Sequence, residues 1–185
     1  MPRMANMPGE ISFDTAWGPC RIGWSNTGVR RFCLPPQSAR RQNEGPPAFV
    51  RAAIRLVTAY FEGQAVDFSP VPLDLSDVTP FRLRVYEALR AVPRGRVVDY
   101  GELASSAGTA GAARAVGQAM AHNPLPLFVP CHRVVAASGR IGGFSAPGGP
   151  VTKRRLLELE ATPLELREGI ARPTRSVLTL SESRP

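Results

Sequence analysis

The first part of the chain has the hydrophobic pattern of short antiparallel strands followed by one helix. Residues 10–34 form short apolar runs that a Gly-Pro and an Asn-Thr-Gly sequence interrupt, as tight turns between strands do. Residues 48–62 then place apolar side chains at helical spacing. We therefore predict a small antiparallel sheet and a helix, joined by the polar, Pro-rich loop 35–47.

The pattern changes after residue 79. Residues 66–79 alternate Asp, Pro and apolar residues, which favours an extended connection, and residues 81–92 then carry one apolar helical face that a Pro-Arg-Gly sequence ends. Beyond a brief extended piece, residues 102–107 and 110–122 are predicted helices that Gly108 separates, a pattern typical of helix-turn-helix units. We place a domain boundary between residues 79 and 80.

The last part of the chain contains a predicted buried segment, a loop and a helix. Residues 125–129 are an apolar run that predicts a buried strand or extended segment, and residues 138–149 contain five glycines and form a loop. Residues 153–160 have amphipathic helical spacing. The pattern as a whole predicts an α+β fold, with domains at 1–79 and 80–160 and a polar, partly disordered tail at 161–185.

Positive charge is concentrated in the second predicted domain. The formal net charge is +8, and residues 80–160 hold 11 basic and 5 acidic side chains. Such a distribution indicates a polyanionic partner, with nucleic acid ahead of a membrane because no basic amphipathic helix with an aromatic face accompanies it. An arginine-rich surface that only faces water fits the charge equally well.

The cysteine content and the absence of targeting signals indicate a reducing compartment. No apolar run approaches the roughly 18 residues of a membrane span, and the N-terminus lacks the apolar stretch of a signal peptide. Cys20, Cys33 and Cys131 are an odd number without framework spacing, so free thiols are expected. We expect a cytoplasmic protein with no membrane association.

Cys131 has the neighbours that a reactive thiol needs. A thiol reacts as its thiolate, and His132 and Arg133 follow Cys131 directly. Adjacent side chains in extended chain point apart, so His132 would reach the sulfur through a bound water or a bend. A cysteine and a histidine side by side in sequence are more typical of an inert core residue than of a reactive one, and Cys20 and Cys33 have no adjacent histidine.

The wider sequence around Cys131 gives a more specific indication. Asn123, Pro130, Cys131, His132, Arg133, Gly139, Gly142 and Ser145 occur in order within NPLPLFVPCHRVVAASGRIGGFS. With AARAVGQAMAHNP before it and KRRLLELE after it, this string resembles the O6-alkylguanine-DNA alkyltransferases over residues 80–160. Residues 1–79 match that family only in general layout.

The resemblance implies a single-use transfer of an alkyl group from guanine in DNA to a cysteine of the protein. Cys131 corresponds to the alkyl acceptor, His132 to a base that acts through a water, and Glu160 to the carboxylate that orients His132. Tyr100 corresponds to the tyrosine that protonates the leaving guanine. Lys153 matches a lysine whose charge stabilises the developing anion.

The resemblance also implies that the protein rotates the damaged nucleotide out of the duplex. Arg114 matches the arginine that fills the vacated place, on a slim helix with Ala113 and Gly117 that enters the minor groove. Asn123 matches the residue that links this helix to the cysteine segment. We further expect Arg133 to contact DNA, with weak sequence preference and strong salt dependence.

The substrate pocket departs from the family pattern in two ways. Phe144 stands where the family usually has tyrosine, and the loop 146–152 is about two residues longer than the pattern. Ser145 is kept, and Val134 and Lys153 complete the expected pocket. The family's zinc ligands have no set of counterparts here, so we expect neither a metal nor another cofactor.

These expectations amount to a monomer that repairs double-stranded DNA containing alkylated guanine. Three other readings stay open at this point. One is a protein that binds alkylated DNA without transferring the alkyl group, and another is a regulator whose cysteine senses alkylation. A cysteine hydrolase is the third, although no oxyanion-hole sequence accompanies Cys131. The range of alkyl groups, and whether alkylated thymine is also a substrate, stay open as well.

Overall fold

A three-stranded antiparallel sheet and one helix form the N-terminal part of the molecule. The computed structural model describes residues 9–38 and 45–160. Strands β1 (Gly9–Phe13), β2 (Cys20–Trp24) and β3 (Val29–Cys33) pair in the order β1-β2-β3, with Ile22 of β2 opposite both Ile11 and Phe32. The sheet is the one predicted from the turn sequences.

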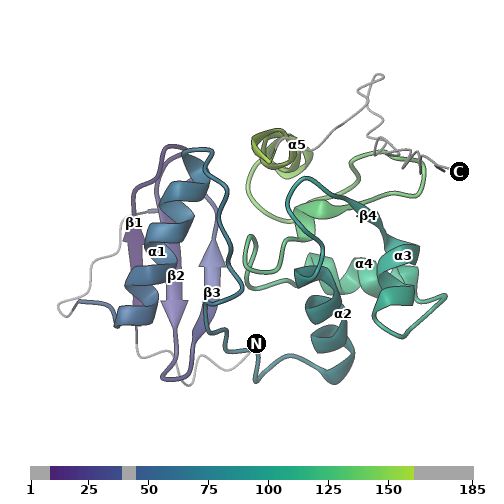
Figure 1. The fold of residues 1–185 in the computed structure, drawn as a ribbon, viewed down its shortest axis with the longest axis horizontal. Helices are drawn as coiled ribbons and strands as arrows, with labels where there is room; N and C mark the ends of the chain where they lie inside the picture. The colour runs from purple at the N-terminus through teal and green to yellow at the C-terminus, as the bar shows by residue number, and fades with distance from the viewer. Residues whose placement is uncertain (1–8, 39–44, 161–185) are drawn as a thin grey trace, which may run out of the picture.

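Helix α1 (Ala48–Phe61) lies across one face of this sheet (Figure 1). Its buried side chains are Val50, Ala53, Val57, Tyr60 and Phe61, a spacing that gives one apolar face. The opposite face of the helix carries its arginines. The predicted helix at 48–62 is confirmed to within one residue.

The connection after α1 is extended and runs beside β3. Val29 N donates to Pro72 O at 2.8 Å, and Asp74 N donates to Val29 O at 2.8 Å. A side chain at Gly28 would place its Cβ 2.7 Å from Pro72 O, so only glycine allows this close approach. The extended connection predicted at 66–79 therefore packs as an additional edge beside the sheet.

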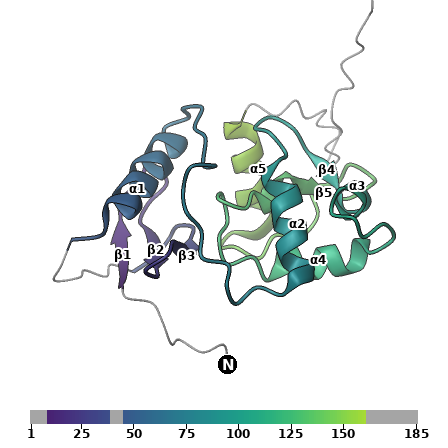
Figure 2. The ribbon, with the colours of Figure 1, turned by 60° about the horizontal axis from the view of Figure 1, so that its bottom comes forward.

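The C-terminal part is mainly helical. It contains α2 (Pro80–Arg90), α3 (Tyr100–Ser106), α4 (Ala113–Ala121), the 3-10 turn η1 (Cys131–Arg133) and α5 (Gly149–Leu159). Two short parallel strands, β4 (Val98–Asp99) and β5 (Val134–Val135), join the start of α3 to the end of η1. Figure 2 shows α2, α3 and α4 grouped on the side away from the sheet.

Two predicted elements of the C-terminal part differ in extent. The helix predicted at 110–122 begins only at Ala113, because Gly111 adopts a positive φ of 83° and keeps the turn after α3 open. The helix predicted to begin at Lys153 begins at Gly149, since Pro150 suits the first helical turn, where its missing N–H costs nothing. The predicted tail 161–185 lies outside the described residues.

The strand or extended segment predicted at 125–129 is wrong. Residues 125–129 form a compact turn in which Val129 N donates to Leu125 O at 2.8 Å, and Leu127 has a positive φ of 70°. Asn123 holds this turn, because its Oδ1 accepts from Leu125 N and its Nδ2 donates to Val129 O. The run is apolar because it is buried between other elements.

Aromatic and backbone contacts join the two parts. Phe128 packs edge-on against Phe32 and Phe68, with ring centroids 5.5 Å and 5.1 Å away. Phe32 N also donates to Pro124 O at 2.9 Å. The turn that precedes Cys131 is therefore seated directly against β3 and the connection.

A capping box at the start of α3 should contribute measurably to stability. Asp99 Oδ1 accepts from Gly101 N and Glu102 N, and Glu102 Oε2 accepts from Asp99 N. Asp99→Ala leaves the N–H groups of Gly101 and Glu102 without a side-chain acceptor. It should lower the free energy of unfolding, measured by urea denaturation, by about 1 kcal/mol. Asp99→Asn, which still accepts, should lose only a few tenths of that; equal losses in the two variants would show that the cap does not act as described.

Candidate active site

Cys131 is the first residue of η1 and borders two cavities. Each cavity has a volume of about 290 Å³. The α4 cavity is lined by Tyr100, Gly117, Met120, Ala121, Cys131, Gly143, Phe144 and Ser145. The β3 cavity shares Ala121, Cys131, Phe144 and Ser145 and adds Arg31, Phe32, Cys33, Leu34, Gln37, Asn123, Pro124, Pro126, Ala146 and Pro147. Cys131 is therefore part of the wall of both cavities.

The Cys131 thiol is held neutral by its surroundings. The residue is 6% exposed, and burial raises the pKa of the thiol. A hydrogen bond from Asn123, the positive charge of Lys153 and the backbone N–H groups of Cys131 and His132 act against that rise and favour the thiolate. The sulfur thus keeps its proton at rest, while groups that stabilise the thiolate are already in place.

His132 is oriented as a proton acceptor. Its Nε2 lies 2.9 Å from Glu160 Oε1, and an ionised carboxylate can only accept, so Nε2 carries the hydrogen. The other ring nitrogen, Nδ1, is then an acceptor, and it is buried without a hydrogen-bond partner among the described residues. Burial lowers the pKa of His132, so the ring is neutral and Nδ1 is free to take a proton.

Glu160 lies just after α5 and is buried with several donors around it. Arg133 donates from Nε to Oε2 at 3.0 Å and from Nη2 to Oε1 at 2.8 Å, and Tyr60 Oη donates to Oε1 at 2.9 Å. Hydrogen bonds from His132 and Arg133, and the charge of Arg133, hold the pKa of Glu160 well below its usual range, against the effect of burial. Glu160 is therefore ionised at neutral pH.

The Arg133 guanidinium bonds mainly within the protein. It also donates from Nη1 to Val92 O at 2.6 Å, and the side chain is 11% exposed. Each of its three nitrogens thus has a partner in the protein. The charge of Arg133 neutralises Glu160 and the side chain joins η1 to the segment just after α2, and the DNA contact expected of Arg133 stays a prediction.

Lys153 is buried beside the cysteine segment. Its ammonium donates to the carbonyl oxygens of Val134 and Gly143, and the residue is 1% exposed. Burial lowers the pKa of Lys153 to about 8. The side chain therefore joins β5 to the loop that carries Phe144, and it also supplies positive charge near the sulfur.

Val134 is not part of either cavity wall. Its side chain is fully buried, and the residue contributes its carbonyl oxygen to Lys153. The expectation that Val134 contributes to the substrate pocket stays a prediction, whereas Phe144 and Ser145 line both cavities.

Tyr100 and Gly117 are neighbours in the wall of the α4 cavity. Tyr100 is the first residue of α3 and half-buried, and burial raises the pKa of its phenol, which therefore stays protonated. A Cβ on Gly117 would lie 3.9 Å from the Tyr100 ring. The absence of a side chain there leaves room beside the phenol.

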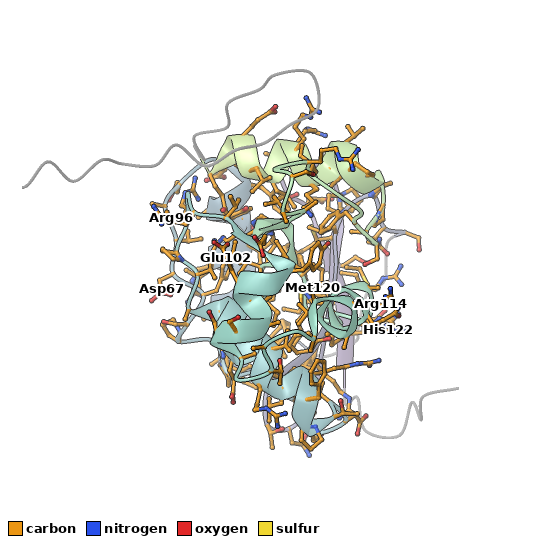
Figure 3. The ribbon with its side chains drawn as sticks, turned by 90° about the vertical axis from the view of Figure 1, so that its right-hand side faces the viewer. Asp67, Arg96, Glu102, Arg114, Met120 and His122 are labelled. Carbon is orange, nitrogen blue, oxygen red and sulfur yellow. The ribbon has the colours of Figure 1, made fainter. Side chains whose placement is uncertain are left out.

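Helix α4 presents Arg114 outward. Val116, Ala119 and Met120 are buried, whereas Arg114 is exposed, and Figure 3 shows Arg114 on the outer side of the helix and Met120 on its inner side. Ala113 is partly buried at the first turn. The helix thus has an inner side that borders the α4 cavity and an outer side that carries the cation of Arg114.

Tyr60 and Arg94 belong to the site although no local sequence feature indicates them. Tyr60 lies 100 positions before Glu160, and Arg94 donates to Leu159 O at 2.6 Å. Only the fold brings these side chains to the end of α5. Among the described residues no cluster of three His, Cys, Asp or Glu side chains could hold a metal ion, and no helix is long and apolar enough to cross a membrane.

The chain is similar to known proteins over most of its length. The family described as "6-O-methylguanine DNA methyltransferase, DNA binding domain" matches residues 80–162. A methylated-DNA--protein-cysteine methyltransferase of Mycobacterium tuberculosis is 47% identical over 152 residues, which cover 80% of this chain and 90% of that protein. A "DNA base-flipping protein" of Thermus thermophilus is 43% identical, with 73% and 89% covered.

Solved structures agree with these relatives. The M. tuberculosis OGT in complex with DNA superposes with a TM-score of 0.70 and 39% identity, covering 82% of this chain and 91% of that one. The O6-methylguanine-DNA methyltransferase of Pyrococcus kodakaraensis has a TM-score of 0.59 and 30% identity, with 82% and 97% covered. The α+β arrangement predicted from the sequence is the fold of these proteins.

Replacing Glu160 should destabilise the protein in a pH-dependent way. Glu160→Gln leaves the Arg133 guanidinium in the interior without its counter-charge and should lower the free energy of unfolding by about 3 kcal/mol near neutral pH. Because the pKa of Glu160 is lower in the folded than in the unfolded protein, its stabilisation is complete above the ordinary value of 4.5. It is lost as the pH falls from there through the folded-state pKa.

Urea denaturation of both proteins at several pH values would measure this difference, which should shrink in acid. Glu158→Gln, on the exposed side of the same helix, is the matched control and should stay within about 0.5 kcal/mol of the unaltered protein. A difference that did not change with pH would contradict an ionised Glu160.

Proposed function

Because the chain belongs to the 6-O-methylguanine DNA methyltransferase family, we propose that it repairs DNA directly, moving an alkyl group from O6 of guanine to Cys131. The observation that carries this proposal is that Cys131 lines the α4 cavity and is followed directly in the chain by His132, which is hydrogen-bonded to Glu160. The family includes both methyltransferases and a base-flipping protein, so membership alone leaves the chemistry open. A cysteine supplied with a base favours transfer.

The transfer follows from the protonation states of the site. His132 Nδ1 takes the thiol proton through a bound water, and the resulting imidazolium is stabilised by Glu160. The sulfur attacks the alkyl carbon, a new S–C bond forms, and the C–O6 bond breaks with its electron pair on the guanine. Tyr100 then gives its phenolic proton to the guanine anion, and the imidazolium proton passes through water to the phenolate, so that Tyr100 and His132 both end neutral.

Lys153 assists this step by its charge. Its ammonium is close enough to Cys131 to favour the thiolate, and a fixed cation in a buried site needs no reorganisation as negative charge develops. The product is a thioether. The sulfur of a neutral thioether is a poor leaving group, so the alkyl group stays on Cys131 and each molecule reacts once.

Guanine reaches the sulfur only after rotation out of the duplex. Arg114 is the exposed cation on α4, the helix whose inner side borders the α4 cavity, and it is placed to fill the gap that the flipped nucleotide leaves. Ala113 and Gly117 keep the helix slim. Asn123 acts at the other end, where it fixes the turn before Cys131 and donates to the sulfur.

The compartment in which the protein acts follows from the thiol chemistry. All three cysteines are free, and the reaction uses one of them as a thiolate, which a reducing compartment preserves. We therefore assign the protein to the cytoplasm, as a monomer acting on double-stranded DNA. We also assign residues 1–79 and 80–160 to two domains that meet at Glu160.

Incubation with duplex DNA containing O6-methylguanine should add one methyl group to the Cys131 peptide, as measured by mass spectrometry. Cys33 is the matched control, because it is also a free thiol and lines the β3 cavity with Cys131. Cys131→Ala should abolish repair, and Cys33→Ala should retain it. Repair by the Cys131→Ala protein, or methylation found on Cys33, would refute the assignment.

Arg114→Ala should weaken repair of duplex DNA by about tenfold or more and affect reaction with free O6-benzylguanine much less, since the free base needs no flipping. Single-turnover rates with the two substrates measure this. Arg96→Ala is the control, because it removes the same charge from another exposed position. Figure 3 shows Arg96 at the left edge of the molecule and Arg114 at the right edge. Equal losses with both substrates, or equal losses in both variants, would exclude the flipping role.

A further inference from the structure

One donor to the Glu160 carboxylate comes from outside the C-terminal part. Within the described residues, Glu160 Oε1 accepts from His132 Nε2, Arg133 Nη2 and Tyr60 Oη, at 2.9, 2.8 and 2.9 Å. His132 and Arg133 belong to η1, but Tyr60 belongs to α1. A carboxylate oxygen has about two lone pairs, so three donors compete for the same electron density.

The Tyr60 hydroxyl is a donor under all ordinary conditions. The side chain is 1% exposed, and both burial and the negative charge of Glu160 raise the pKa of its phenol. It therefore does not ionise, and its hydrogen has one acceptor. The ring is fixed by Phe61 and Phe68, with centroids 5.5 and 5.7 Å away.

Arg94 contacts both the Tyr60 ring and the residue before Glu160. Its guanidinium lies 5.6 Å from the centre of the Tyr60 ring and donates to Leu159 O, directly before Glu160. It also donates to Gln64 O and Gly63 O, just after α1. The end of α1 and the end of α5 are thereby held together, with the phenol between them.

We propose that Tyr60 is a positioning residue of the alkyl transfer, through which the N-terminal part sets how strongly Glu160 attracts the proton of His132. The proposal rests on the proposed function, because it assigns Tyr60 a role in that reaction. Tyr60 touches neither cavity and acts only through Glu160. Its hydroxyl takes up part of the carboxylate charge that would otherwise act on the imidazole.

The direction of the effect follows from the charges around His132. Glu160 favours the imidazolium, whereas Arg133 and Lys153 oppose it and the neighbouring Cys131 is neutral. Removal of the phenol leaves Glu160 Oε1 to Arg133 and His132 alone, so the carboxylate holds the imidazolium more strongly. A base that is already protonated cannot accept the thiol proton, and the reaction therefore fails at a higher pH than before.

Tyr60→Phe tests this, since it keeps the ring and the contact with Arg94. The acid limb of the single-turnover rate with O6-methylguanine duplex should move up by about half a pH unit, which is about a threefold loss of rate on that limb. The chain has only two histidines, so isotope-labelled histidine gives separate ring signals for His132 and the exposed His122. The pKa of His132 measured by NMR should rise by the same amount.

Tyr86→Phe is the matched control. Tyr86 is equally buried, and its hydroxyl donates to Ala119 O at 2.9 Å without touching Glu160, so its loss should leave the acid limb in place. Thermal unfolding of both variants would show whether they are folded at the assay temperature. If either variant is unfolded there, all proteins are assayed at a lower temperature at which both are folded. The role of Tyr60 would be overturned if the acid limb of the rate and the pKa of His132 moved equally in the two variants. It would also be overturned if they moved in neither variant.

The unaltered protein in the same assay separates this inference from the proposed function. If it transfers no methyl group to Cys131, the proposed function fails. If it transfers the group and Tyr60→Phe behaves as Tyr86→Phe does, only the inference about Tyr60 fails.

Discussion

The rest of the site depends on the buried negative charge of Glu160. A carboxylate taken out of water costs several kcal/mol unless charges and hydrogen bonds compensate it. Here the compensation comes from Arg133, His132 and Tyr60, which lie on η1 and α1. The Glu160 carboxylate at the end of α5 is therefore stable only where both η1 and α1 contact it. The same requirement fixes the tautomer of His132, and through it the nitrogen that can serve as a base.

In the proposed reaction, burial has opposite effects on the pKa values of the thiol and the imidazole, and this keeps the proton on the sulfur at rest. It raises the pKa of the Cys131 thiol and lowers the pKa of His132, so both are neutral at rest. Proton transfer creates a thiolate and an imidazolium together, and each has a partner already in place: Asn123 and Lys153 for the sulfur, Glu160 for the ring. A permanently ionised thiolate would be hydrated or oxidised more readily, whereas a neutral thiol that ionises only with its substrate is protected.

The sequence predicts those parts of the site that are local in the chain. The strands, the helices and the segment around Cys131 follow from turn sequences, periodicity and a specific string of residues. The turn at 125–129 does not, because a short buried apolar run looks the same in a strand and in a turn that Asn123 holds by side-chain hydrogen bonds. The ion pair of Arg133 does not follow from the sequence either, because its partner, Glu160, lies 27 residues away. Tyr60 is separated from Glu160 by 100 residues, so only packing can reveal it.

The loop 138–149 is the part of the site that the buried charge constrains least. The sulfur, the base and the carboxylate are fixed by hydrogen bonds between regular elements, but Phe144 and Ser145 lie on a segment with glycines at positive φ, among them Gly142 and Gly148. Its link to the buried network is the contact from Lys153 to the Gly143 carbonyl at 3.4 Å. Phe144 lines both cavities, so a shift of this loop changes the space for the alkyl group without disturbing the His132–Glu160 pair. In the proposed reaction, the space for the alkyl group and the proton transfer thus depend on different parts of the chain, and Phe144 bears on the first alone.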